Sequence, residues 1–171
     1  AAGFSIVRYS GTGSSATVGH GLSAAPEIVI VKRTDSTGNW SFNGSVGGLT
    51  YGSNKLLFNS SNGANSDTNE VTAASSTTFT VSTSSSVNQN GGSYTAYCFH
   101  SVSGFSKFGS YSGSGSLQTI TTGFTPDYVV IKKTNANGED WAVFSSYDLG
   151  MSLNSFNQTQ SQQAFNNSTM F

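Results

Sequence analysis

Short apolar runs separated by clusters of Gly, Ser, Asn and Pro recur along the chain, and none of them has the period of a helix. In the first part of the chain these runs predict strands at 3–10, 15–18, 26–34, 40–43, 55–59, 77–83 and 93–101. Short strands of this kind are typical of an antiparallel β-sandwich, Ig-like or jelly-roll-like, of about one hundred residues. A barrel is the competing β architecture.

The order of apolar and polar side chains predicts which strand faces are buried. Phe79 and Val81 alternate with Thr and Ser, so one face of that strand is expected in the core and the other in solvent. The run 28–31 is continuously apolar and requires cover on both faces, from a second sheet on one side and a loop or a neighbouring subunit on the other. In the last strand, one face is expected to carry Tyr94, Ala96, Cys98 and His100.

The sequence repeats itself after 100 to 102 residues, with four anchors in the same order. Gly3-Phe4-Ser5 recurs as Gly104-Phe105-Ser106, Tyr9–Ser14 as Tyr111–Ser116, Pro26–Thr34 as Pro126–Thr134, and Gly38 with Trp40 as Gly138 with Trp141. The small differences in offset fall in Gly/Ser stretches, where insertions are tolerated. The chain therefore contains two copies of one unit.

We predict two tandem sandwich domains, at residues 1–103 and 104–171, of which the second is incomplete. The second copy lacks an equivalent of strand 93–101, and a sandwich without that strand has an unpaired edge and an open core. Either further chain supplies the strand, a partner donates it, or the second copy is a reduced version, and we favour the first two. The Ala at the start and Phe171 at the end also suggest a piece of a longer or processed chain.

Composition excludes several classes of protein. Gly (20), Ser (32), Thr (19) and Asn (15) make up half of the 171 residues, and only 9% are charged. Seven Leu and two Met do not support a helical bundle, and no apolar run reaches the roughly 18 residues of a membrane span. Seven cations balanced by eight acids form no phosphate-binding surface, so nucleic acid is not an expected partner. Aromatic residues at 12% oppose disorder.

Few residues are candidates for chemistry. Cys98 and His100 share a strand face, but without a third orienting group we interpret them as a core thiol beside a strand-end histidine. His20 lies between two glycines in a turn and has no carboxylate cluster nearby to complete a metal site. Glu139 and Asp140 are adjacent and would point to opposite faces of a strand. We therefore expect no catalytic residue, metal or cofactor.

Two pairs of cations and two tryptophans occupy corresponding positions in the copies. Lys32, Arg33, Lys132 and Lys133 close the two apolar strands, where cations usually keep a sheet edge soluble but can also bind an anionic sugar. Trp40 and Trp141 each follow the next turn, and either can pack in the core, form a subunit contact or stack on a sugar ring. These six residues are the candidate glycan or subunit contacts.

Several strings of the sequence resemble a known family. They are Gly3–Tyr9, Thr17–Leu22, Pro26 with 28–32 and Trp40, and Tyr97–Phe99 leading into Gly104–Tyr111. They resemble a repeated domain of uncharacterised type in virion proteins of marine tailed phages, including phages of cyanobacteria, which are commonly labelled tail-fibre or other structural components. The resemblance covers nearly all of the first copy and half of the second. It implies a place in the virion and brings no catalytic residues with it.

These observations predict a non-enzymatic structural component of a phage virion: a tail fibre, a head fibre or a capsid decoration protein. We expect it to form a homo-oligomer, to contact other virion proteins and to take part in host attachment. The alternative is a carbohydrate-binding module that recognises host surface glycans. An enzyme acting on polysaccharide would need two convergent carboxylates, and the acids here are scattered.

Overall fold

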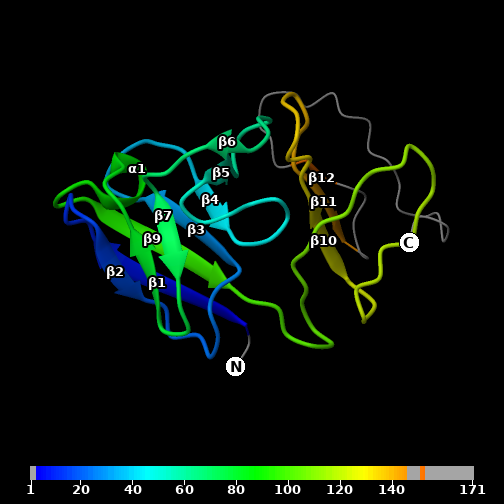
Figure 1. Cartoon of the computed structure of the whole chain (residues 1–171), viewed down its shortest axis with the longest axis horizontal. Coiled ribbons are helices and arrows are strands. Elements are labelled where there is room, and N and C mark those ends of the chain that lie inside the picture. The colour runs from blue at the N-terminus through cyan, green and yellow to red at the C-terminus, as the bar shows by residue number, and fades with distance from the viewer. Residues whose placement is uncertain (1–2, 146–150, 153–171) are drawn as a thin grey trace.

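In the computed structural model nearly all of the regular secondary structure consists of antiparallel strands, and the structure describes residues 3–145 and 151–152 (Figure 1). The elements are β1 (Phe4–Ser10), β2 (Ala16–Gly19), β3 (Ile28–Arg33), β4 (Ser41–Gly44), β5 (Asn54–Leu57), β6 (Asn65–Ser66), β7 (Val71–Ala74), β8 (Thr78–Val81), α1 (Ser85–Asn88), β9 (Ser93–Phe99), β10 (Tyr128–Ile131), β11 (Ala142–Ser145) and β12 (Met151–Ser152). The predicted all-β antiparallel class is confirmed.

β9 lies inside a six-stranded sheet with the order β1-β9-β3-β4-β5-β6. It pairs with β1 from Phe4↔Phe99 to Ser10↔Ser93, and on its other edge with β3. The last strand of the first repeat therefore joins its first strand to its central apolar strand. As the alternation predicts, Tyr94, Ala96 and Cys98 are buried on one face of β9, whereas His100 lies beyond the end of the strand.

A smaller sheet, β2-β8-β7, covers one face of the larger sheet. The core between them contains Leu22, Val29, Val31, Val71, Phe79, Val81, Val87, Tyr94, Ala96 and Cys98. Phe79 and Val81 are fully buried while their neighbours in β8 are half-buried, which follows the predicted alternation. The first repeat is thus a β-sandwich. Because β1 and β6 stand at opposite ends of the larger sheet, the barrel alternative is wrong.

β3 is covered on both faces, as its unbroken apolar run predicts. Val29 and Val31 point into the sandwich core. Ile28 and Ile30 point the other way, toward what we call the outer face, and are also buried. The segment after β9 folds across this face, where the ring of Phe108 lies 5.9 Å from that of Phe99.

The sequence pattern did not predict three short elements, β6, β7 and α1. α1 is a single turn whose capping residue, Ser84, accepts a hydrogen bond from the backbone N of Ser86. The buried side chain of Asn88 donates to the carbonyls of Ser14 and Ser82, each at 2.6 Å, and accepts from the N–H of Thr12 at 2.7 Å. Contacts distant in sequence hold this turn in place, so the local sequence shows no helical period here. It is too short to cross a membrane, and it is the one helix of the described residues.

The β10–β11 hairpin of the second repeat reproduces the β3–β4 hairpin of the first. β3 pairs with β4 from Ile28↔Gly44 to Val31↔Ser41, and β10 pairs with β11 from Tyr128↔Ser145 to Ile131↔Ala142. The offsets of 100 and 101 are those of the sequence repeat. Gly13 and Gly115 also correspond, with φ of 74° and 72°, a conformation that favours glycine. The duplication is therefore structural, while the boundary between residues 103 and 104 stays a prediction.

Replacing Phe79 tests the sandwich core. Phe79→Ala leaves a cavity between the two sheets, and we expect it to lower the free energy of unfolding by about 3–5 kcal/mol in urea titrations. Phe105→Ala is the matched control, because that ring is 69% exposed. The control should change the free energy of unfolding by less than about 0.5 kcal/mol. Equal losses in the two variants would contradict the assigned core.

Candidate functional site

The second repeat is anchored to the first by Trp141, which directly precedes β11. Its side chain is 3% exposed and packs against the buried Leu49 and Leu56. The centre of its ring system lies 4.9 Å from that of Phe42 and 4.8 Å from that of Phe58. We call Phe42, Leu49, Leu56 and Phe58 the tryptophan socket. Aromatic side chains packed at such distances stabilise a contact beyond the area that they bury.

The register of β4 and β5 places the socket on the outer face. Phe42 pairs with Leu56, so the two side chains point to the same side of the sheet, opposite to that of Ser41. The indole N–H of Trp141 donates to the carbonyl of Leu57 at 3.1 Å. The ring therefore has its apolar surface buried and its polar atom satisfied, as a buried tryptophan requires.

Backbone hydrogen bonds join the repeats beside the socket. The N–H groups of Ala64, Gly63 and Gly138 donate to the Thr134 carbonyl at 2.7 Å, the Asn137 side chain at 2.9 Å and the Ser61 carbonyl at 3.1 Å. A Cβ on Gly63 would lie only 2.6 Å from the carbonyl O of Ala136. Because only glycine permits so close an approach, a side chain at this position would push the repeats apart. Figure 1 shows β10–β12 beside the end of the sandwich that carries β4, β5 and β6.

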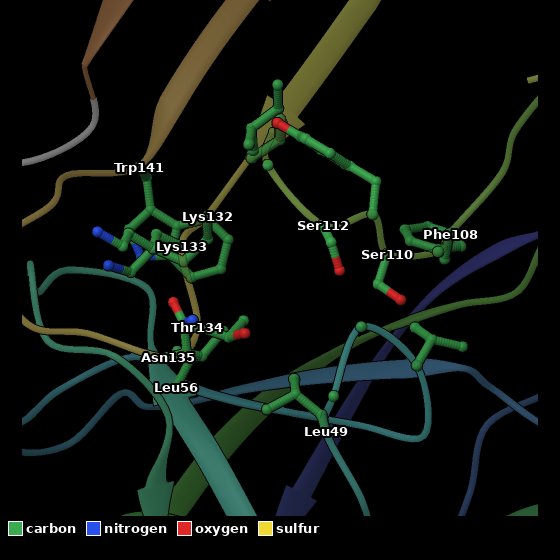
Figure 2. A pocket seen from close by; sticks show the side chains of 18 of the residues that line it. Leu49, Leu56, Phe108, Ser110, Ser112, Lys132, Lys133, Thr134, Asn135 and Trp141 are labelled. Atoms are coloured by element: carbon green, nitrogen blue, oxygen red, sulfur yellow. The ribbon is translucent and has the colours of Figure 1, made fainter. Parts of the chain in front are cut away.

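A cavity of about 1170 Å³ opens next to the socket, between the two repeats, and its wall includes residues 107–113 of the segment that precedes β10. Figure 2 shows Lys132, Lys133 and Trp141 on one side of this cavity, and Phe108 and Ser110 on the other. Its lining mixes the apolar edge of the socket with glycine, serine and lysine residues. The cavity is lined by three of the predicted site residues, Lys132, Lys133 and Trp141, and it is not predictable from either repeat alone.

The lysines of the second repeat are held by acceptors of the protein. Lys132 Nζ donates to the carbonyl of Ser61 at 3.0 Å and to that of Glu139. Lys133 Nζ lies 3.7 Å from the Glu139 carboxylate at an exposed position. Burial lowers the pKa of Lys132, and Asp140 and Glu139 offset this only in part. The partners of both ammonium groups, Ser61 and Glu139, do not line the cavity, so these contacts do not direct either group toward it.

The corresponding cations of the first repeat lie away from this cavity. Lys32 Nζ donates to the carbonyl of Arg33 at 2.7 Å. Arg33 forms an ion pair with Asp35 at 2.7 Å, and the hydrogen bond between them raises the pKa of Arg33 and lowers that of Asp35. The structure therefore does not gather the four predicted cations into one anion-binding surface.

The two tryptophans are equivalent in sequence and differ in environment. Trp40 is half-buried, and its ring centre lies 5.8 Å from that of Tyr97 on the outer face of β9. Trp141 is enclosed by the socket and presents no free ring face for a sugar. Of the two, only Trp40 keeps part of its ring accessible for a glycan or another subunit.

A buried polar cluster beneath β4 and β5 escaped the sequence analysis. Glu70 is 2% exposed, and its carboxylate accepts hydrogen bonds from the Ser41 hydroxyl and from Lys55. Asn43 donates to the Ser41 hydroxyl at 2.8 Å, and Lys55 also lies 2.8 Å from Asp67. The one sequence signal was a lysine and two acidic residues, Lys55, Asp67 and Glu70, within the otherwise uncharged stretch 36–106.

The ammonium group of Lys55 is shared between the two carboxylates of this cluster, Asp67 and Glu70. Burial alone would lower the pKa of Lys55, but its hydrogen bonds with Asp67 and Glu70 outweigh burial and raise that pKa. Burial alone would likewise raise the pKa of Asp67, and the Lys55 hydrogen bond lowers it overall. A carboxyl with a depressed pKa stabilises the fold above its ordinary pKa of about 3.9, and this contribution is lost as the pH falls through the lower folded-state pKa.

The Cys98 thiol and the His20 ring are both held within the fold. Burial raises the pKa of the Cys98 thiol to about 11, and the hydrogen bond with Ser5 offsets this only in part, so the thiol is protonated at neutral pH. His20 is buried, accepts from the N–H of Leu22 at 3.0 Å and lies 3.1 Å from the Ser75 carbonyl, which fits a neutral ring with its proton on Nε2. Among residues 3–145 and 151–152, no group of three metal-ligating side chains comes together.

The sandwich, its duplicated hairpin and the tryptophan contact between the repeats define an all-β protein built by duplication of one unit. Comparison with known families places it more closely. The chain belongs to the family described as Domain of unknown function (DUF7483), whose model matches residues 1–170 and so spans both repeats. No curated protein and no solved structure matches the chain.

Removal of Lys55 tests the buried cluster. Lys55→Met leaves the Glu70 carboxylate buried without a counter-charge, and we expect the free energy of unfolding to fall by about 3–5 kcal/mol at neutral pH. Lys133→Met removes an exposed lysine whose ion pair is longer, and should cost no more than about 0.5 kcal/mol. Urea unfolding monitored by tryptophan fluorescence measures both. A neutral effect of Lys55→Met would show that the cluster is not essential for stability.

Proposed function

We propose that this protein is a non-enzymatic structural component whose repeats assemble through their outer faces, and that it serves in a phage virion as a tail fibre, head fibre or capsid decoration protein. The place in the virion rests on the resemblance of its sequence strings. The assembly role is supported by one observation above all: Trp141 of one repeat fills a socket of Phe42, Leu49, Leu56 and Phe58 in the other.

The surface of the molecule suits repeated association. Phe4 and Ile6, on the outer face of β1, are 43% and 58% exposed. They continue the aromatic surface of β9, because the ring of Phe4 stacks 4.7 Å from that of Phe99. Apolar anchors among uncharged polar residues allow contacts that bury no unpaired ion, which keeps the desolvation cost of association low. Trp40, half-buried against Tyr97, lies on this same outer face.

The absence of catalysis is part of the proposal and is supported by the roles of the polar groups. Glu70, Lys55 and Ser41 bind one another beneath the sheet, and the Cys98 thiol is protonated in the core. Groups that are fully engaged in the fold are not free to bind a substrate or transfer its protons.

Self-association of the intact chain tests the proposal. We expect concentration-dependent oligomers in light scattering at micromolar concentration. Trp40→Ala should weaken them by about tenfold, because interface tryptophans often contribute 1 kcal/mol or more to binding. The folding control is the circular dichroism spectrum of the variant, which should be unchanged. A chain that stays monomeric at all accessible concentrations would contradict self-assembly.

Glycan binding is the second candidate function, and the cavity favours it. The serine and glycine residues of segment 107–113 supply hydroxyl and backbone groups that suit a sugar, next to the exposed Lys107. The enclosed ring of Trp141 counts against stacking at this position. A monomer that binds oligosaccharides, and that loses them on Ser110→Trp in the cavity wall, would favour this function over assembly.

A further inference from the structure

The strand β10 has a single paired edge within the described residues. Its counterpart in the first repeat, β3, pairs with β4 on one side and with β9 on the other. β10 pairs with β11 on the first side, and no strand within residues 3–145 or 151–152 pairs with it on the second. An edge of this kind presents free N–H and C=O groups and is a template for another strand.

The exposure of equivalent side chains shows what this edge lacks. Ile28 and Ile30 of β3 are 3% and 9% exposed, whereas the equivalent Tyr128 and Val130 of β10 are 61% and 40% exposed. Because the backbone pairing of the two hairpins is the same, the hairpin itself does not cause this difference in side-chain exposure. In the first repeat, Ile28 pairs with Phe99 and Ile30 with Tyr97. Among the neighbours that β10 lacks are therefore the aromatic side chains of a strand like β9.

We propose that the free edge of β10 binds an extended segment of the β9 type, in the register that β9 adopts on β3. Such a segment has the pattern of Ser93–Phe99: small or core-facing side chains alternate with outer-face Thr, Tyr and Phe. By the repeat offset, Tyr128 faces the position of Phe99, Val129 that of Cys98, and Val130 that of Tyr97. This mode of recognition is β-strand addition, in which backbone hydrogen bonds give affinity and alternate side chains give specificity.

A folded second copy does not supply this segment. In the folded protein β9 lies between β1 and β3 and has both edges paired. Withdrawal of β9 would break the two longest ladders of the sandwich. The occupant is therefore a strand that is not yet part of a completed sandwich. The inference rests on the duplication of the hairpin and is independent of the proposed virion role.

A peptide with the sequence of residues 91–101 tests the register by disulfide trapping on the intact chain. The chain variant Val129→Cys places a thiol opposite peptide Cys98, as Val29 lies opposite Cys98 in the first repeat. A disulfide needs Cα atoms about 4.4–6.8 Å apart, so the in-register pair should form it at least tenfold faster than the shifted variant Val130→Cys. Intact mass of the chain after incubation in a glutathione buffer measures the adduct.

Two controls separate strand addition from chance oxidation. A peptide with Tyr97→Pro loses an N–H and cannot extend the sheet, so its adduct with Val129→Cys should form as slowly as that of the shifted variant. The unsubstituted chain, whose one cysteine is buried in the core, should form almost none.

Two results would each overturn the proposal. The first is an equal rate of adduct formation by the Val129→Cys and Val130→Cys chains while circular dichroism shows a native fold. The second is the formation of oligomers of the chain that block the adduct. The second result would assign the edge to a folded second copy. Light scattering of the chain without peptide tests the proposed function separately, so the two proposals can fail independently.

Discussion

The first repeat depends on the pairing of β9 with both β1 and β3. β9 is the last strand of the repeat in sequence and an inner strand of the larger sheet. Its core-facing side chains, Tyr94, Ala96 and Cys98, meet the smaller sheet, while Tyr97 and Phe99 cover the outer side of β3. Closing the repeat thus requires contacts between its two ends, so the sandwich is completed only when its final strand is in place.

The outer face of the same sheet explains how two repeats become one structure. A sheet in a sandwich usually leaves its second face to solvent, but here that face is apolar from β1 to β5. Trp141 covers one end of it and Phe108 covers the middle. The exposed Phe4 and Ile6 lie at the other end. The contact between the repeats therefore uses only part of a surface that extends further.

The polar side chains of the interior bind one another and neighbouring backbone groups. Lys55 and Glu70 neutralise each other beneath the socket strands, and Asn88 fixes the turn of α1 to the loop before β2. Such contacts fix which loops meet which strands. A protein whose polar groups are engaged internally and whose apolar face is partly open is suited to assembly, which is the function that we propose.

The sequence alone determined the positions of most strands of the sandwich, the buried face of β8, the double cover of β3 and the duplication. These follow from local alternation and from identities repeated at a fixed offset, which need no knowledge of distant contacts. Local pattern did not predict β7, where the ladder with β8 is irregular between Val71 and Ala73, or the one turn of α1, which hydrogen bonds from Asn88 to the distant loop 12–14 hold in place. Nor did it distinguish Trp40 from Trp141, because the two residues have the same place in the repeat. Only the tertiary structure decided that one ring fills a socket and the other stays partly accessible, since burial depends on which surface the fold brings against each residue.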